Sequence, residues 1–190
     1  LRVNASAFHM EYEDKQELIF DNVTRILNIY NAASATSEGV ELETRLQATQ
    51  WLTLNASYGL MDTKYDEFII PGGAVFSGNP LGSSPEDKIS LSANLAIPVG
   101  EWGEITGMAL YSSTSSYFTG ASADPGLRVP AYDLINVSLG IAPQAGPWSI
   151  TAFVRNLTDE EYLLTPSTQT VRSEYLGEPR TIGVSLTWAF

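Results

Sequence analysis

The sequence has 190 residues, no cysteine, 44% hydrophobic residues and a net charge of −12. This length suits one domain rather than two, and the absence of cysteine excludes a disulfide framework or a thiolate metal site. The acidic excess, with no basic cluster to offset it, argues against a nucleic-acid partner, whose phosphates would be repelled.

Membrane-spanning helices are also excluded, because no run of about 18 apolar residues occurs. Membrane-spanning strands stay open, since they alternate and never build such a run. The chain opens on Leu1 without a charged n-region and an apolar h-region, so we expect a mature product or a fragment of a longer protein.

Most of the chain alternates between apolar and polar residues with the period of a β-strand. The charged segment 11–21 is the one place that invites a helix, and it lacks apolar residues repeating at three and four positions. The facing of the first and fifth runs is ambiguous. We expect strands over residues 2–12, 24–47, 51–68, 88–97, 102–117, 132–142, 148–157 and 182–190.

The two faces of these strands differ in chemistry. One face carries Ser, Thr, Asn, Gly, Glu and Arg, which would make a poor soluble core but suit a hydrated lumen. The other face is apolar and is expected to point outward. Its clearest members are Ile89, Leu91, Leu95, Ile135, Val137, Leu139, Val184, Leu186 and Trp188.

The connections alternate in length. Long, turn-rich segments around 71–85, 118–129 and 158–176 alternate with short turns near Gln50, Gly100 and Gly146. Outer-membrane barrels sort their connections in this way, with short turns in the periplasm and long loops outside. Runs of about ten residues also match a tilted membrane crossing, whereas soluble strands average about five to six. The pattern favours an antiparallel transmembrane β-barrel meander over a soluble β-sheet.

Four stretches carry a family resemblance. They are GEPRTIGVSLTWAF at 177–190, VRNLTDEEY at 154–162, VPAY at 129–132, and EGVELE at 38–43 followed by WLTL at 51–54 and Tyr58. In their order along the chain, from residue 38 to residue 190, they resemble the carboxy-terminal part of TonB-dependent receptors.

The resemblance implies a bacterial outer-membrane receptor that imports a scarce solute, such as an iron–siderophore complex. Such receptors carry an amino-terminal plug domain and an energy-coupling box, through which the TonB protein acts, and neither is present in this sequence. Eight strands are about a third of the roughly 22 that such transporters use. Residues 1–190 are therefore expected to be the carboxy-terminal third of a receptor barrel, with the solute set by the missing part.

Charged residues mark the expected lumen. Glu41, Glu43 and Arg45 alternate on one face, and each would cost about 2–4 kcal/mol in lipid. We interpret them as a lumenal charge ladder, with a substrate-binding role as the alternative. Lys88 and Arg155 are expected in the same lumen, paired with those acids.

Other polar residues have a structural and a functional interpretation. Asn156 and Asp159 are candidate ligands, but an Asx-type turn at a strand end explains both. The acidic segments 159–161 and 11–21 could hold a divalent cation or be solvated loops. His9 is the only histidine, so a two-histidine site or a Ser–His–Asp triad cannot be built within the chain.

No catalytic constellation or cofactor motif is present, so we expect neither an enzyme nor a cofactor. An enzyme of the outer-membrane phospholipase type is excluded, because the chain offers no plausible Ser–His pair. The remaining alternative is a complete, small eight-stranded barrel with a structural or interaction role, since eight strands can close one.

The last strand carries an expected assembly signal. The resemblance implies that the barrel-assembly machinery reads the closing strand, with Phe190 as a main determinant and Trp188 and Leu186 on the same face. The alternative is that Phe190 only anchors the strand at the lipid interface, contributing about 1–3 kcal/mol through buried area.

Overall fold

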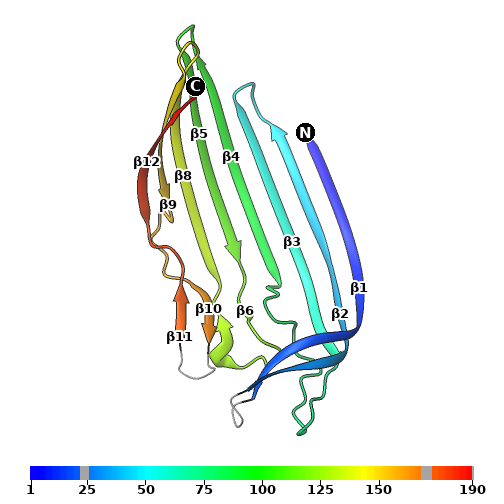
Figure 1. Ribbon diagram of the computed structural model, residues 1–190. Helices are drawn as coiled ribbons and strands as arrows, with labels where there is room; N and C mark the ends of the chain where they lie inside the picture. Colours follow the sequence, from blue (N-terminus) through cyan, green and yellow to red (C-terminus); the bar gives the residue numbers. More distant parts are fainter. Residues whose placement is uncertain (22–25, 168–172, 190) are drawn as a thin grey trace.

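The computed structural model describes residues 1–21, 26–167 and 173–189 (Figure 1). Eight strands form one antiparallel sheet with the order β1-β2-β3-β4-β5-β8-β9-β12. The predicted all-β meander of eight long strands is therefore confirmed. The strands are β1 (Arg2–Asp21), β2 (Ile26–Gln47), β3 (Leu52–Glu67), β4 (Asp87–Val99), β5 (Gly103–Thr114), β8 (Tyr132–Pro143), β9 (Trp148–Arg155) and β12 (Thr181–Trp188).

Tight turns join the strands at one end of the sheet. The hydroxyl oxygen of Thr49 accepts hydrogen bonds from the backbone N–H groups of Trp51 and Leu52, each at 3.1 Å, before β3 begins. Gly100, with a φ of 57°, follows β4, and the N–H of Trp102 donates to the carbonyl of Val99 at 3.2 Å. A glycine adopts this left-handed backbone at no steric cost, which permits the reversal.

The outer half of β1 differs from the expectation for residues 11–21. We expected a solvated loop there, but the strand continues to Asp21 and pairs with β2 from Glu11↔Thr36 to Asp21↔Ile26. The cause is non-local: the neighbouring strand β2, which is as long as β1 or longer, satisfies the backbone hydrogen bonds, whatever the charge of the side chains.

The long connections also contain structure of their own, where we expected loops throughout. Segment 118–129 holds a 3₁₀ turn, η1 (Pro125–Leu127), and a strand pair, β6 (Tyr117–Phe118) with β7 (Arg128–Val129). Segment 158–176 holds the hairpin of β10 (Leu163–Ser167) and β11 (Ser173–Leu176).

The sheet has two different ends. Figure 1 shows the tight turns at one end, where β1 starts and β12 finishes, and the long connections at the other. We call these the short-turn end and the outer end. Among the described residues, the small buried core lies at the outer end, where Tyr65, Phe68 and Leu81 pack with Ala35 and Ala121.

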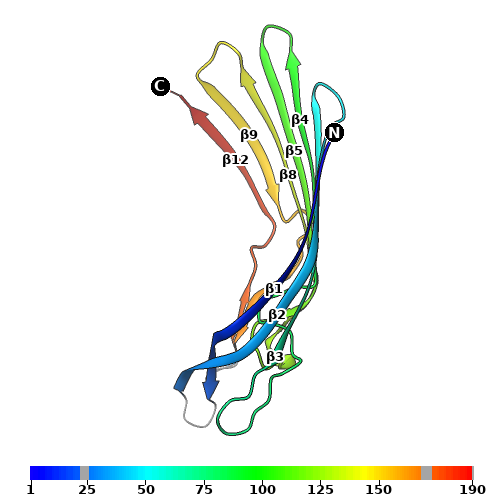
Figure 2. The ribbon, with the colours of Figure 1, turned by 90° about the vertical axis from the view of Figure 1, so that its right-hand side faces the viewer.

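The sheet is curved and open (Figure 2). β1 and β12 form its two edges and do not pair with each other. This chain therefore does not form the closed eight-stranded barrel of the small-barrel alternative. In the described part of the chain, no helix has the length and apolar character needed to cross a bilayer.

Candidate functional site

Strand register sorts the side chains onto two faces. Residues directly opposite in neighbouring antiparallel strands point to the same side of the sheet. One such row runs from Val3 through Thr44, Ala56, Leu91 and Tyr111 to Ile135. The register therefore resolves the facing of β1 and β5, which the sequence leaves ambiguous.

The expected outward residues all fall on the face of this row, which we call the apolar face. Ile89, Leu91 and Leu95 on β4 share it with Ile135, Val137 and Leu139 on β8. Val137 lies opposite Val154 of β9, and Val154 lies opposite Ile182, which places Val184, Leu186 and Trp188 there too. Ile182, Val184, Leu186 and Trp188 are 54–74% exposed, because no protein covers this face.

Aromatic residues border the apolar face at the short-turn end. All four tryptophans of the chain lie there, at the turns or at adjoining strand ends. Trp148 opens β9 and lies directly opposite Trp188 at the end of β12. Trp51 and Trp102 lie in the turns before β3 and β5. Tryptophan rings are favoured at the level of lipid headgroups, so they mark one edge of an apolar band.

Charged residues border the band at the outer end. On the apolar face, Leu60 of β3 is followed by Asp62, and Val40 of β2 is preceded by Glu38, which lies directly opposite Asp62. β4 begins with Asp87, which accepts a 2.7 Å hydrogen bond from the hydroxyl of Tyr58. The apolar runs of β2, β3 and β4 thus end abruptly in a carboxylate, where these strands leave the apolar band.

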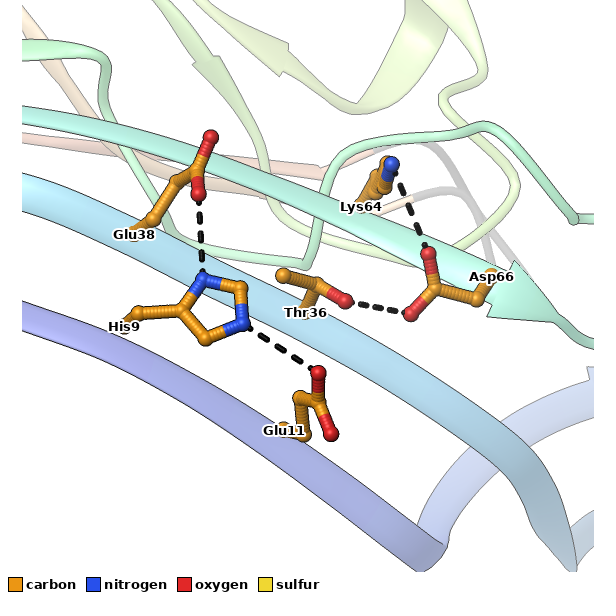
Figure 3. Close-up of polar contacts among 6 residues, drawn as sticks. All are labelled: His9, Glu11, Thr36, Glu38, Lys64 and Asp66. Atoms are coloured by element: carbon orange, nitrogen blue, oxygen red, sulfur yellow. Dashed lines mark hydrogen bonds and ion pairs between the residues drawn. The ribbon is translucent and has the colours of Figure 1, made fainter.

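His9 lies in this charged border (Figure 3). Its Nδ1 is 3.0 Å from Glu38 of β2, and its Nε2 is 3.2 Å from Glu11 of β1. Carboxylates only accept hydrogen bonds, so both contacts are hydrogen bonds at once only when both ring nitrogens carry a proton and the imidazole is a cation. Two hydrogen bonds raise the pKa of His9 above its ordinary value. The one with Glu11 has the larger effect, and the one with Glu38 comes second.

A second polar group in Figure 3 links β2 to β3. The hydroxyl of Thr36 donates to Asp66 at 2.5 Å, and Nζ of Lys64 lies 3.6 Å from the other oxygen of that carboxylate. Two basic residues, Lys64 and His9, lie on the part of β1 to β3 where Glu38 is directly opposite Asp62.

The five predicted lumen residues share the opposite, polar face. Glu41 and Lys88 fall in one row through Gly59, and Glu43 and Arg45 follow along β2. Arg155 ends β9 on the same side of the sheet.

A shallow surface cavity of about 330 Å³ lies on the polar face. Glu43, Arg45 and Arg2 line it together with Asn4, Asn55 and the serines of β3 and β4. Its floor is held by side-chain hydrogen bonds, including Asn55 to Ser92 at 3.0 Å.

The ion pairs on this face differ from those we expected. Nη1 of Arg155 lies 3.9 Å from Glu178 in the segment before β12, and not beside Glu41 or Glu43. Glu41 accepts a hydrogen bond from Ser6 at 3.2 Å. Within residues 1–21, 26–167 and 173–189, Lys88 and Arg45 form no ion pair. Strand register, which sequence alternation cannot supply, holds these charges apart.

Asn156, at the outer end of the sheet, forms hydrogen bonds through its backbone N–H and through both polar atoms of its side chain. Its backbone N–H donates to Oδ1 of Asn136 at 2.9 Å, and its Nδ2 donates to the carbonyls of Glu160 and Glu178 at 2.9 and 3.1 Å. Its Oδ1 accepts the N–H of Glu160 at 2.8 Å. The side chain is 3% exposed and its φ is 49°, a left-handed backbone that asparagine tolerates.

Asp159 completes the same network. Its Oδ1 accepts the backbone N–H of Arg180 at 2.9 Å, and its Oδ2 lies 3.5 Å from Nη2 of Arg180. We call Asn156 and Asp159, with the segment 178–180 that they hold, the outer latch. Both side chains are used within the chain, which agrees with the Asx-turn interpretation rather than with a ligand role. Sequence reasoning missed the partners Glu178 and Arg180, because they lie 22 and 21 residues away along the chain.

The acidic segments do not converge on a cation site. In the described residues, no group of three or more His, Asp and Glu side chains is arranged to hold a metal ion. The carboxylates of segment 11–21 are instead distributed along β1, and Glu17 accepts a 2.7 Å hydrogen bond from the hydroxyl of Tyr65.

The expected assembly signal lies only partly within the described chain. Leu186 and Trp188 point to the apolar face of β12, opposite Ile150 and Trp148. Phe190 lies outside the described residues.

An open antiparallel meander with one apolar band, one polar face and all long connections at one end is a segment of a transmembrane β-barrel wall. Residues 1–157 match the family model described as "TonB dependent receptor-like, beta-barrel", and the chain belongs to this family. Its members are outer-membrane proteins of Gram-negative bacteria, and so is this chain.

Solved structures share this fold. The ferric yersiniabactin uptake receptor FyuA from Yersinia pestis matches 99% of the chain at 19% identity with a TM-score of 0.81. BauA, the ferric preacinetobactin receptor from Acinetobacter baumannii, matches 98% at 19% identity with a TM-score of 0.73. The ferric-catecholate import receptor Fiu from E. coli K12 matches 99% at 18% identity with a TM-score of 0.73. The chain spans 27%, 27% and 25% of these three proteins.

Proposed function

We propose that this chain is the carboxy-terminal part of the barrel of a TonB-dependent receptor, which takes up a scarce solute across the outer membrane. The observation that carries the proposal is the open wall with two unpaired edges, β1 and β12. Unpaired edges expose backbone hydrogen-bonding groups that cannot stay unsatisfied in lipid. The edges therefore call for further strands of the same barrel, β1 pairing with the preceding strand and β12 with the first strand. No observation favours the alternative of a complete small barrel with an interaction role.

The polar face is proposed as the lumen. Glu41, Glu43, Arg45, Lys88 and Arg155 share that face. An arginine or lysine that faced the bilayer midplane would cost about 2–4 kcal/mol, and a glutamate somewhat less. The serines and asparagines between them hydrogen-bond one another. Such a surface suits water or a plug domain packed within the barrel. The solvent-exposed apolar face would then contact outer-membrane lipid.

The outer end is proposed as the extracellular side. It carries the long connections and the charged border of the band, while the short-turn end carries the tryptophans. Protease added to intact cells is expected to cut only around segments 71–85, 118–129 and 158–176. Cuts confined to the short turns near Gln50, Gly100 and Gly146 would reverse the orientation.

The transported solute is proposed to be an iron–siderophore complex. Proteins of similar structure include an uptake receptor for ferric yersiniabactin, an import receptor for ferric catecholates and the ferric preacinetobactin receptor. Energy for uptake would come from the TonB protein, acting on a plug domain elsewhere in the full-length protein. The receptor itself is not proposed to catalyse a reaction.

Uptake in a deletion strain tests this function. Cells lacking the gene for the full-length protein would be grown under iron limitation and supplied with ⁵⁵Fe bound to a panel of catecholate, hydroxamate and carboxylate siderophores. We expect uptake of at least one complex to disappear and to return with the intact gene, but not in cells that lack TonB. Unchanged uptake of every complex, or restored uptake without TonB, would refute the proposal.

Assembly gives a second test, which concerns Phe190. If the barrel-assembly machinery reads this residue, deleting it from the full-length receptor slows insertion, while assembled barrels keep near-normal heat resistance. If Phe190 only anchors the strand, insertion proceeds at the normal rate and the finished barrel is less stable. Pulse-labelled insertion and heat-modifiability gels separate the two roles.

A further inference from the structure

The closing strand β12 faces a register problem that the other strands do not. In a hairpin, a short turn fixes which residues pair. β9 and β12 are instead joined by residues 156–180, a connection that contains the hairpin of β10 and β11. Such a long connection allows β12 to slide along β9.

The alternating pattern does not prevent that sliding. A slip of one residue would turn the apolar side chains toward the polar face. A slip of two would keep Ile182, Val184, Leu186 and Trp188 on the apolar face. Lipid forms no interlocking core against them, so apolar burial alone hardly distinguishes the two registers.

The outer latch holds the segment that leads into β12. Asn156 binds the carbonyl of Glu178 through Nδ2, and Asp159 binds the N–H of Arg180 through Oδ1. Both contacts go to backbone atoms within three residues of Thr181, where β12 begins. A slip of two residues would move those atoms by about 6.6 Å along the strand and break both hydrogen bonds.

The latch is itself anchored to the sheet. Asn156 is buried, its N–H is held by Asn136 of β8, and its Oδ1 binds Glu160. Through the latch, the segment before β12 is hydrogen-bonded to residues that are themselves fixed to two strands, β8 and β9. A buried amide with all these contacts cannot shift without leaving polar atoms unsatisfied.

We propose that the outer latch sets the register of β12 on β9, and through it the stagger with which the barrel closes. The number of strands and the stagger together determine the geometry of a closed barrel. A β12 slipped by two residues would present its free edge to the first barrel strand two residues out of place. The proposal rests on the barrel-wall assignment and does not depend on the transported solute.

A glycine–aromatic pair offers a rival register device. A Cβ atom on Gly183 would lie 2.4 Å from Cζ of Phe153, so the ring occupies the space that a side chain would need. A slip of two would place Thr181 or Ser185 against that ring. The experiment must separate this pair from the latch.

Disulfide trapping in the full-length receptor reads the register directly. The present chain has no cysteine, and other reactive cysteines of the receptor would be replaced. Ala152→Cys with Val184→Cys reports the native register, because the two residues are directly opposite. Ala152→Cys combined with Ile182→Cys or Leu186→Cys reports a slip of two residues in either direction, since the native Cα separation of such diagonal pairs disfavours a bond.

The latch variant is Asn156→Ala with Asp159→Ala. We expect it to raise the ratio of slipped to native cross-link about tenfold or more, because each lost hydrogen bond shifts such an equilibrium by up to roughly tenfold. Thr158→Ala is the matched control, as an exposed residue of the same turn, and should keep the native ratio. Asp159→Asn, which keeps an acceptor oxygen, should also keep it.

Two outcomes would overturn the proposal. One is a latch variant whose cross-link ratio equals that of Thr158→Ala. The other is slipping in Gly183→Ala but not in the latch variant, which would assign the register to the glycine–aromatic pair. If the double variant fails to reach the outer membrane, Asp159→Ala alone and the same ratio measured on receptor refolded in detergent decide between these outcomes.

Discussion

The apolar band and the outer end of the same sheet are organised by different forces. In the band, every strand repeats a simple alternation, and many of the apolar side chains, such as Leu91, Leu139 and Val184, are exposed. At the outer end, specific contacts appear: a buried aromatic cluster at β3, a charged border on β1 to β3, and the outer latch beside β12. The band thus determines which way side chains face, whereas the outer end determines how strands are aligned and bent.

The two edge strands of the sheet, β1 and β12, also differ in how they are held in place. β1 pairs with β2 over nearly its whole length, and the outer part of that hairpin reaches the aromatic cluster through Ile19 and Tyr30. β12 pairs with β9 over eight residues and then depends on the latch. A long edge strand is held by many weak pairings, whereas a short one needs a few specific bonds.

Phe68→Ala is expected to have the largest effect at the outer end. The ring is fully buried, with centroids 5.1 Å from Tyr65 and 5.2 Å from Phe76. Its removal should cost about 3–5 kcal/mol of local stability. Hydrogen exchange of the full-length receptor should show faster exchange in the outer parts of β1 and β2 and unchanged exchange in the band. Ile69→Ala, at a neighbouring residue that is 59% exposed, is the control; equal effects would show that the cluster does not hold the hairpin.

An arginine scan along β3 locates the border between the two regions. Ala56→Arg places a charge in the middle of the band and should destabilise the receptor by about 2–4 kcal/mol, whereas Asp62→Arg beyond the band should change stability by about 0–1 kcal/mol. Both positions lie on the apolar face. Denaturant unfolding in lipid bilayers measures the difference. Similar costs at the two positions would contradict the assigned band.

Gly183→Ala tests whether packing also acts on the polar face of the sheet, behind the apolar band. The added Cβ meets the Phe153 ring, which must move, so we expect a loss of about 1–3 kcal/mol. Gly59→Ala is the control on the same polar face, since a Cβ atom there has no neighbour within 4 Å. Heat-modifiability gels compare the two variants. A loss in Gly59→Ala as large as in Gly183→Ala would assign the effect to backbone flexibility instead.

His9 should give the smallest effect, because the side chain is more than half exposed. Hydrogen bonds with Glu11 and Glu38 raise its pKa. A raised pKa means that its stabilising contribution is fully present below about pH 6.5 and is lost as the pH rises through the higher folded-state value. The stability difference between the native receptor and His9→Gln should therefore shrink as the pH rises from about 6.5 through that higher folded-state value. A difference that stays constant over this range would show that His9 does not titrate as this pair requires.

Local pattern was enough for the layout of the eight long strands and for the facing of all of them except β1 and β5. The eight runs and the outward set from Ile89 to Trp188 follow from a period of two, which each strand carries in its own residues. Family motifs such as VRNLTDEEY and GEPR also lie within single short stretches. None of these features needs information about a distant part of the chain.

Contacts between residues that are distant along the chain could not be predicted from the sequence. The acidic half of β1 is a strand because β2 lies beside it, and Arg155 meets Glu178 rather than Glu41 or Glu43 because of strand register. Segments 118–129 and 158–176 fold into short strand pairs for the same reason.

The sequence by itself therefore determined the eight long strands, the apolar and polar faces of all of them except β1 and β5, and the sorting of long and short connections. Only the tertiary structure decided register, curvature and the pairing of Asn156 and Asp159 with residues 178–180. The physical reason is that alternation is unchanged by a slip of two residues, so it carries information about facing and none about alignment. Alignment depends on hydrogen bonds between segments that the chain brings together only when it folds.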